Sequence, residues 1–142
     1  MNRYLLLNMG FVSNLHRKIT MDAFHEEGIR RSQPWILDFL AEHDQVIQRE
    51  LAERAYFDPA TITSALVRME EEGMIRRESV PGDKRALRVV LTEKGREKQQ
   101  YVQKVFARAE EAALNGFTQQ ERRQLGEFLI RIQKNLEKEV DR

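Results

Sequence analysis

Apolar residues recur at helical spacing over most of the chain, which predicts a mainly α-helical protein. The first helix is expected over residues 2–26, where the apolar side chains form two adjacent stripes. Two stripes are wider than a small core needs, so we expect this helix to be shared with a second subunit; exposure of the extra residues is the simpler alternative. Shorter helices are expected over residues 33–43 and 48–55, and long ones over residues 93–115 and 119–140.

Residues suited to helix ends mark where several helices begin and stop. Asp58 can accept hydrogen bonds from the free amides of a first turn, and Pro59 needs no amide partner there. Gly73 suits the left-handed residue that follows a helix. Together they predict a helix over residues 58–72. Ser32 is expected to cap the helix that starts at residue 33, and Thr118 opens a capping box for the last helix.

A short hairpin is the predicted exception to the helical pattern. Strands are expected over residues 75–79 and 87–91, joined by a tip in which Pro81 and Gly82 favour a turn. The hairpin carries five basic residues against two acidic ones, a local excess of three positive charges: Arg76, Arg77, Lys84, Arg85 and Arg88, with Glu78 and Asp83. Such a hairpin can be a solvated edge that resists aggregation. Its position directly after the 58–72 helix instead favours nucleic-acid binding.

The outer face of the 58–72 helix has an unusual chemistry. Its residues are short and mostly polar, without the glutamates and lysines that cover most solvated helices: Ala60, Thr61, Thr63, Ser64, Val67 and Arg68. Such a face can enter the major groove and offer donors and acceptors to base edges and phosphates. The alternative is that it packs against another part of the protein.

Composition narrows the possible functions. A chain of 142 residues, 41% hydrophobic and 33% charged, fits one soluble domain with helical extensions. A net charge of only +1 argues against polyanion binding over the whole surface, so the basic hairpin would act as a local patch. Without cysteine, disulfides, thiolate metal sites and thiol redox sensing are excluded. The apolar run at residues 4–7 is too short for a membrane span or signal peptide, so a soluble, cytoplasmic protein is expected.

The central stretch resembles the winged helix-turn-helix of the MarR family, the multiple antibiotic resistance regulators. The resemblance rests on these segments: Leu51-Ala52, Thr61-Ile62-Thr63, Gly73-Met74-Ile75, Arg77, and Asp83-Lys84-Arg85 followed by Leu91-Thr92-Glu93-Lys94-Gly95. The most specific part is the Asp-x-Arg wing joined to Leu-Thr-x-x-Gly. The resemblance implies a winged helix-turn-helix over residues 31–95 for DNA, and helical dimerisation regions over residues 1–30 and 96–142, within one composite domain.

The resemblance also implies roles for individual residues. The major-groove contacts would come from the helix that begins at Asp58, through Thr61, Thr63, Ser64 and Arg68. On the wing, Lys84 and Arg85 would contact DNA, with Arg85 in the minor groove. Asp83 would support the wing by pairing with Arg76 or Arg77.

The chain departs from the family pattern at two positions of the recognition helix. Many relatives carry serine where this chain has Ala60, and arginine where it has Ser64. Serine has a shorter reach and fewer donors than arginine. Base readout is therefore expected to depend more on the hydroxyl groups, on Arg68 and on DNA shape.

The function implied is that of a homodimeric repressor on a palindromic promoter site in double-stranded DNA. Family members often respond to phenolic or other aromatic acids, and an effector of this kind would release the repressor. Here His16, Arg17, Trp35 and Phe39 are the candidates for lining an effector pocket. Each can also be explained as an ordinary core or surface residue.

Other classes of function have less support. A metal-responsive regulator of the same fold would need clustered ligands, but His16, His25 and His43 are far apart in the sequence and no His-x-x-x-His pair occurs. We therefore expect no metal and no cofactor. A winged-helix adaptor that binds protein or RNA is favoured only by the near-neutral net charge. An enzyme is not expected, because the chain lacks a glycine-rich phosphate loop and a paired nucleophile and base.

Overall fold

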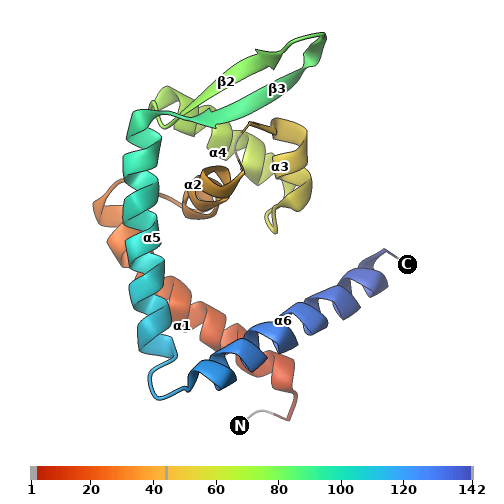
Figure 1. The fold of residues 1–142 in the computed structure, drawn as a ribbon. Helices are drawn as coiled ribbons and strands as arrows, with labels where there is room; N and C mark the ends of the chain where they lie inside the picture. The colour runs from red at the N-terminus through yellow and green to blue at the C-terminus, as the bar shows by residue number, and fades with distance from the viewer. Residues whose placement is uncertain (1–2, 44, 142) are drawn as a thin grey trace. The chain divides into compact units, whose positions relative to one another are not determined.

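The computed structural model describes residues 3–43 and 45–141, and it confirms a mainly helical protein with a small sheet (Figure 1). The elements in chain order are α1 Leu5–Glu26, α2 Gln33–Glu42, β1 Val46–Ile47, α3 Gln48–Arg54, α4 Pro59–Glu71, β2 Ile75–Val80, β3 Asp83–Leu91, α5 Glu93–Ala113 and α6 Gln119–Val140. Residue 2, where the first helix was expected to begin, lies outside the described residues. The two-residue strand β1 was not predicted. Among the described residues, no helix is long and apolar enough to span a membrane.

The chain divides into two compact units, residues 1–109 and residues 110–142. The first unit has a single apolar core drawn from every one of its helices and from the sheet. Its fully buried members are Phe24, Ile29, Ile36, Leu37, Leu51, Ile62, Leu66, Met69, Ile75, Val89 and Val102. Phe24 lies on α1 and Val102 on α5, so the region expected to bind DNA shares its core with both flanking helices. Tyr101 strengthens this connection by donating a hydrogen bond from its hydroxyl to the Ala23 carbonyl, 3.0 Å away.

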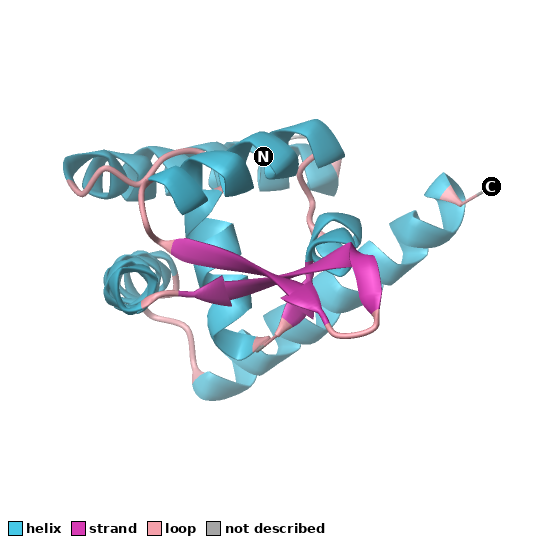
Figure 2. Ribbon diagram, turned by 90° about the horizontal axis from the view of Figure 1, so that it is seen from above, coloured by secondary structure: helices cyan, strands magenta, loops and turns pink. Residues whose placement is uncertain are grey.

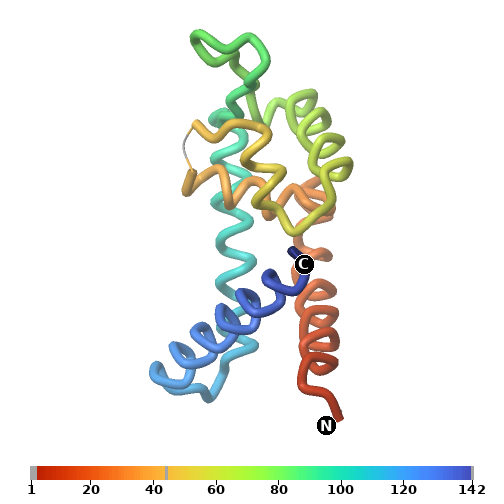
Figure 3. Tube along the Cα trace, turned by 90° about the vertical axis from the view of Figure 1, so that its right-hand side faces the viewer, coloured from red at the N-terminus to blue at the C-terminus, as the bar shows by residue number. Residues whose placement is uncertain are grey.

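The sheet has the strand order β1-β3-β2 and is antiparallel throughout (Figure 2). β2 and β3 form the predicted hairpin, with Ile75 opposite Leu91 and an irregularity between Ser79 and Val80. β1 pairs Val46 with Val89, which joins the segment before α3 to the base of the hairpin. Within the first unit, the tip of the hairpin and the first residues of α1 lie at opposite ends (Figures 1 and 3).

Most of the predicted helix caps are present. The Asp58 side chain caps α4, and Thr118 and Glu121 form the expected capping box at the start of α6. The expected cap at Ser32 is wrong. Ser32 has helical backbone angles, with φ −78° and ψ −9°, and its hydroxyl makes no capping hydrogen bond. The hydroxyl of an N-cap residue reaches the first-turn amides from an extended backbone, which Ser32 does not adopt.

The second unit contains the end of α5, a turn and α6. Gly116 has φ +84°, and Arg122 closes the turn by donating to a Glu111 carboxylate oxygen at 2.8 Å and to the Leu114 carbonyl at 3.1 Å. None of the described α6 residues is buried in the single chain. Its apolar side chains Leu125, Phe128, Leu129, Ile130, Leu136 and Val140 are between 36% and 84% exposed.

Candidate nucleic-acid interface

The Asp58 cap and the apolar core hold α4 in an orientation that leaves one of its faces exposed to solvent. Asp58 accepts hydrogen bonds from the Thr61 amide at 2.9 Å and from the Thr61 hydroxyl at 2.6 Å. These bonds hold the pKa of the Asp58 carboxyl below its usual value. On the inner face Ile62, Leu66 and Met69 are fully buried. The outer face therefore points away from the core, and its exposed residues are those that the sequence singled out: Ala60, Thr63, Ser64, Val67 and Arg68, with Thr61 half-buried.

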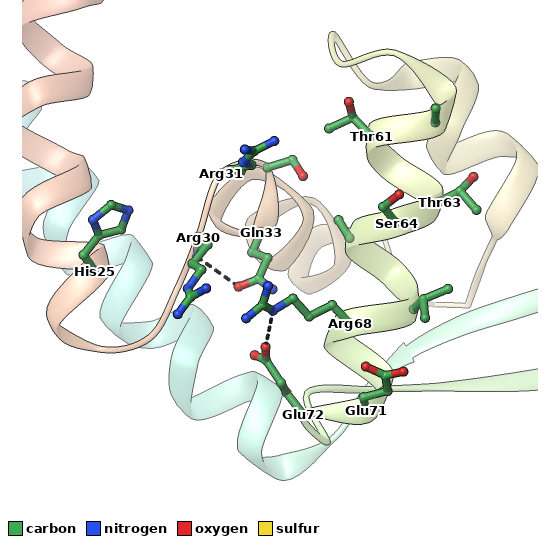
Figure 4. A pocket seen from close by; sticks show the side chains of 14 residues that line it. His25, Arg30, Arg31, Gln33, Thr61, Thr63, Ser64, Arg68, Glu71 and Glu72 are labelled. Atoms are coloured by element: carbon green, nitrogen blue, oxygen red, sulfur yellow. Dashed lines mark hydrogen bonds and ion pairs between the residues drawn. The ribbon is translucent and has the colours of Figure 1, made fainter.

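The polar groups of this face are partly committed to bonds within the helix. The Thr61 hydroxyl donates to Asp58, and the Thr63 hydroxyl donates to the Pro59 carbonyl at 2.9 Å. Both hydroxyl oxygens are therefore left mainly as acceptors. Arg68 donates from Nε to Glu72 at 2.7 Å (Figure 4), so only its two terminal nitrogens remain for another partner.

The C-terminal end of α4 is held by the segment that begins α5. The Thr92 hydroxyl donates to the Gly73 carbonyl at 2.5 Å, and Lys94 Nζ donates to the Glu72 carbonyl at 2.6 Å. The Thr92 amide donates to the Met74 carbonyl at 3.0 Å. Carbonyls at a helix end have no partner within the helix, so these bonds supply the missing donors. This explains the Leu-Thr-x-x-Gly motif in physical terms.

Gly95 completes this contact by close approach. A Cβ atom on residue 95 would lie 2.0 Å from the Met74 carbonyl oxygen, a distance that real structures do not contain. The Gly95 amide also donates to the Thr92 hydroxyl at 3.1 Å. Glycine is therefore required here so that the first turn of α5 can pack on the turn that follows α4.

Arg77 fastens the base of the hairpin to the helices. Its guanidinium donates to the two Glu70 carboxylate oxygens at 3.0 and 3.3 Å, and to Gln48 Oε1 at 3.4 Å. Arg77 also lowers the pKa of the Glu70 carboxyl. β2 is thus connected to the last turn of α4 and to the start of α3. Gln48 was not identified from the sequence, because only the fold brings it near Arg77.

The expected pairing of Asp83 with Arg76 or Arg77 is wrong. Arg76 pairs with Glu78 at 3.3 Å, and Arg77 with Glu70. Asp83 instead accepts a hydrogen bond from the Arg85 backbone amide at 3.0 Å, which shapes the tip of the hairpin locally. The strand register places Asp83 opposite Val80 at the tip, whereas Arg76 and Arg77 lie nearer the base of the hairpin and pair with residues there.

Lys84 and Arg85 are exposed at the tip of the hairpin. Within residues 3–43 and 45–141, neither side chain makes an ion pair. Both cations therefore remain available to an outside partner, as the wing prediction requires.

A cleft of about 1040 Å³ runs along the outer face of α4. One wall is α4 itself, including Thr61, Ser64 and Arg68; the other is formed by Arg30, Arg31 and Gln33 (Figure 4). The two arginines follow directly after the turn at Gly28. Sequence reasoning missed them, although a pair of arginines just before a helix was a signal that could have been used.

Three of the four candidates for an effector pocket belong to two separate ring clusters. Trp35 stacks on Phe39 with ring centroids 5.0 Å apart, and the Arg54 guanidinium lies 5.0 Å from the centre of the Phe39 ring. His16 stacks instead on Phe106 of α5 at 6.0 Å. Arg17 donates to the Asn14 side chain at 2.9 Å. None of the four lines the cleft beside α4.

Comparison with known proteins finds relatives that are transcriptional regulators. The model of the MarR family matches residues 27–86. The HTH-type transcriptional regulator YybA of Bacillus subtilis (strain 168) is 27% identical over 135 residues, which are 95% of this chain and 90% of that protein.

Solved structures give the same picture. The transcriptional regulator SlyA is similar with a TM-score of 0.87 and 28% identity, covering 95% of each chain. A MarR family transcriptional regulator from Listeria monocytogenes, complexed with 26mer DNA, has a TM-score of 0.89 at 23% identity, covering 95% of this chain and 90% of that one. The latter likeness concerns the fold.

Proposed function

Because the chain belongs to the MarR family of DNA-binding transcriptional regulators, we propose that it acts as a homodimeric repressor of a palindromic promoter site. The observation that carries this proposal is the recognition helix α4. Its short-chained face is exposed, while its two ends are fixed by Asp58 and by the Thr92–Gly95 segment. A helix held in this way can enter a major groove with little loss of conformational freedom.

The proposed contacts follow from the exposed groups. Thr61 and Thr63 offer acceptor oxygens to base edges, Ser64 offers a hydroxyl, and the terminal nitrogens of Arg68 face a guanine or a phosphate. Arg85 reaches the adjacent minor groove, with Lys84 on the flanking phosphates. Only a small part of this surface is cationic, so specificity must come from base edges and DNA shape.

Two uncovered apolar faces support a dimer. On α1 the exposed apolar side chains are Leu5, Leu6, Leu7, Met9, Phe11, Val12, Leu15 and Ile19, and α6 carries a second set. Contiguous apolar surface of this extent is unusual on a soluble monomer and marks an interaction site. In a two-fold dimer each subunit would read one half-site, with half-site centres about 10 base pairs apart.

Direct binding measurements test the function itself. In fluorescence anisotropy at low salt, the protein should bind a random-sequence duplex, and its affinity should fall steeply as salt is raised. Fragments selected from the host genome should bind more tightly and contain an inverted repeat. A winged-helix adaptor for protein or RNA would leave the duplex unbound, which would refute the proposal.

The wing assignment predicts a specific loss of affinity. The Arg85→Ala protein should bind a selected fragment more weakly by about 1–3 kcal/mol, because a minor-groove contact is removed. Its melting temperature should match that of the wild type, since the side chain is exposed. Arg96→Ala, which removes an exposed charge at the start of α5, is the control and should bind normally. Equal affinity of Arg85→Ala and wild type across a salt titration would contradict the assignment.

The Arg77 anchor predicts an indirect effect on DNA binding. Arg77→Ala should loosen the hairpin, speed hydrogen exchange of the β2 and β3 amides and weaken DNA binding, because Glu70 and Gln48 lose their shared partner. Arg76→Ala removes only an exposed pair with Glu78 and should leave the exchange rates unchanged. Equal exchange rates in the two variants would show that Arg77 is not an anchor.

The same anchor should respond to pH. The folded-state pKa of Glu70 is lowered by Arg77, so the stabilisation is present above the pKa of glutamate in the unfolded chain. It is lost as the pH falls through the lower folded-state pKa. Protection of the hairpin amides in the wild type should therefore decrease on acidification, and the Arg77→Ala protein should lack this dependence.

We also propose that a small aromatic acid releases the repressor. The ring cluster of Trp35 and Phe39, with Arg54 beside it, offers stacking surface and a cation for a carboxylate. His16 and Arg17 would take part only if the effector bridged both clusters. A thermal shift screen of aromatic acids should find a compound that raises the melting temperature and lowers DNA affinity. A screen in which no acid does so would count against an effector.

A further inference from the structure

We propose that the loop carrying Arg30 and Arg31, together with Ser32 at the start of α2, is a second phosphate-binding edge of the DNA surface. It would hold the sugar-phosphate backbone that borders the major groove on the α2 side of α4. This inference rests on the proposed DNA-binding function and adds residues that neither the recognition helix nor the wing contains.

The position of the cleft suits a DNA strand. An α-helix with its side chains is about 10–12 Å across, close to the width of a major groove of about 12 Å. A helix seated in the groove therefore has a phosphate ridge along each side. The cleft beside α4 is open along the outer face of that helix, and Arg30 and Arg31 stand on its opposite wall (Figure 4). No described residue of the wing lines it.

The charge around α4 explains why such an edge is needed. Among the described residues, the only cation on the outer face of the helix is Arg68, which is paired with Glu72. Glu71 and Glu72 also line the cleft, so the helix by itself would repel phosphates there. Arg30 and Arg31 are exposed, and in the part of the chain that the structure describes neither forms an ion pair. These two arginines are the cations that can make the electrostatic potential in the cleft positive.

The loop is ordered before any ligand arrives. The Arg30 amide donates to Gln33 Oε1 and the Gln33 amide donates to the Arg30 carbonyl, each at 3.0 Å. Ile29 and the Gln33 side chain are buried and anchor the loop to the core. Arg31 has φ +47°, a left-handed conformation that is strained for a residue other than glycine. Holding two adjacent arginines beside α4 therefore costs the loop some conformational energy.

Ser32 provides an independent indication of a ligand. Ser32 is 1% exposed and lines the cleft, yet its hydroxyl finds no hydrogen-bond partner among the described residues. Buried hydroxyls without a partner are uncommon, because desolvation is then uncompensated. The hydroxyl lies at the N-terminal end of the ten-residue helix α2, where the positive end of the helix dipole favours an anion. A phosphate oxygen that draws the two arginines toward itself would give this hydroxyl its missing acceptor.

The test uses the full-length protein and a labelled random-sequence duplex in a salt titration. Arg30→Gln/Arg31→Gln should lower the affinity on the order of tenfold at low salt. The variant should also show a shallower salt dependence. In a plot of the logarithm of the binding constant against the logarithm of the salt concentration, the slope should decrease in magnitude by about 0.9 for each phosphate that is no longer neutralised. The decrease in affinity should be the same on a selected fragment, because phosphate contacts carry no sequence information. Arg30→Lys/Arg31→Lys should retain most of the slope. Arg96→Gln, which removes one exposed charge outside the cleft, is the control for the loss of each charge.

Ser32→Ala separates binding from folding. It should weaken DNA binding severalfold while its melting temperature stays equal to that of the wild type or rises, because an unpartnered buried hydroxyl is removed. A hydroxyl with a purely structural role would lower the melting temperature instead.

Three outcomes would overturn the inference. In the first, the wild type binds DNA and Arg30→Gln/Arg31→Gln shows the same salt slope as the wild type. That result would contradict the phosphate-binding edge and leave the proposed function intact. In the second, Arg96→Gln lowers the affinity as much as Arg30→Gln/Arg31→Gln does. The decrease would then reflect the net charge of the protein and not a contact made by this loop. The third is a decrease confined to the selected fragment, which would indicate base contacts. A wild-type protein that binds no duplex would instead refute the proposed function.

Discussion

Gly95→Ala should destabilise the protein by about 3 kcal/mol or more, the upper range for overpacking at a buried site. The added methyl group would lie 2.0 Å from the Met74 carbonyl oxygen, which belongs to the backbone and cannot rotate away. Relief requires α5 to move away from the turn after α4, and this breaks the bonds from Thr92 and Lys94 to that turn. The free energy of unfolding, measured in urea, checks the effect, and DNA binding should fall with it.

Gly126→Ala is the matched control. Gly126 lies inside α6, and a Cβ atom there would meet no other atom within 4 Å. Alanine is favoured over glycine in a helix interior by about 0.5–1 kcal/mol, so this variant should be as stable as the wild type or slightly more so. If Gly95→Ala unfolded at the same urea concentration as Gly126→Ala, the close packing of α5 on Met74 would be disproved.

Phe128→Asp should dissociate the proposed dimer and with it remove tight DNA binding. Phe128 is 51% exposed in the single chain and belongs to the apolar stripe of α6. A buried aromatic residue at an interface is commonly a hot spot, so its replacement by a charge should raise the dimer dissociation constant on the order of 100-fold or more. A monomer reads one half-site instead of two, so the decrease in affinity for a palindrome should be larger still. Analytical ultracentrifugation and anisotropy measure the two effects.

The control for this variant is Gln120→Asp. At 100° per residue, residue 120 lies on the far side of α6 from the apolar stripe, and Gln120 is exposed. The same carboxylate there should leave the protein dimeric and bound to DNA. A monomeric wild type, or a Phe128→Asp protein that remains dimeric, would remove the basis for the dimer.

The success of the sequence predictions depended on the distance over which each interaction acts. The caps by Asp58 and Thr118 involve a side chain and an amide three residues away, and both are present. The failed cap at Ser32 is the instructive exception. There the buried Ile29 and the reciprocal bonds between Arg30 and Gln33 set the backbone of the loop, and that backbone takes the hydroxyl away from the helix amides.

Interactions between distant segments were not predictable in the same way. Arg76 and Arg77 are adjacent in the sequence, and nothing local distinguishes them. The fold turns Arg77 toward Glu70 and Gln48, the latter 29 residues away, and leaves Arg76 with its neighbour Glu78. β1 was missed for the same reason, because its two residues become a strand only by pairing with β3.

The sequence by itself determined the ends of α4, the chemistry of its outer face and the motif that links the wing to α5. Helix caps, helical periodicity and the conformational preferences of proline and glycine act within a few residues, so they can be predicted from the sequence alone. The tertiary structure decided which carboxylate each arginine meets, why residue 95 must be glycine, and that Arg30 and Arg31 face α4 across a cleft. These facts depend on distances between segments far apart in the chain, which are set by the packing of a common core.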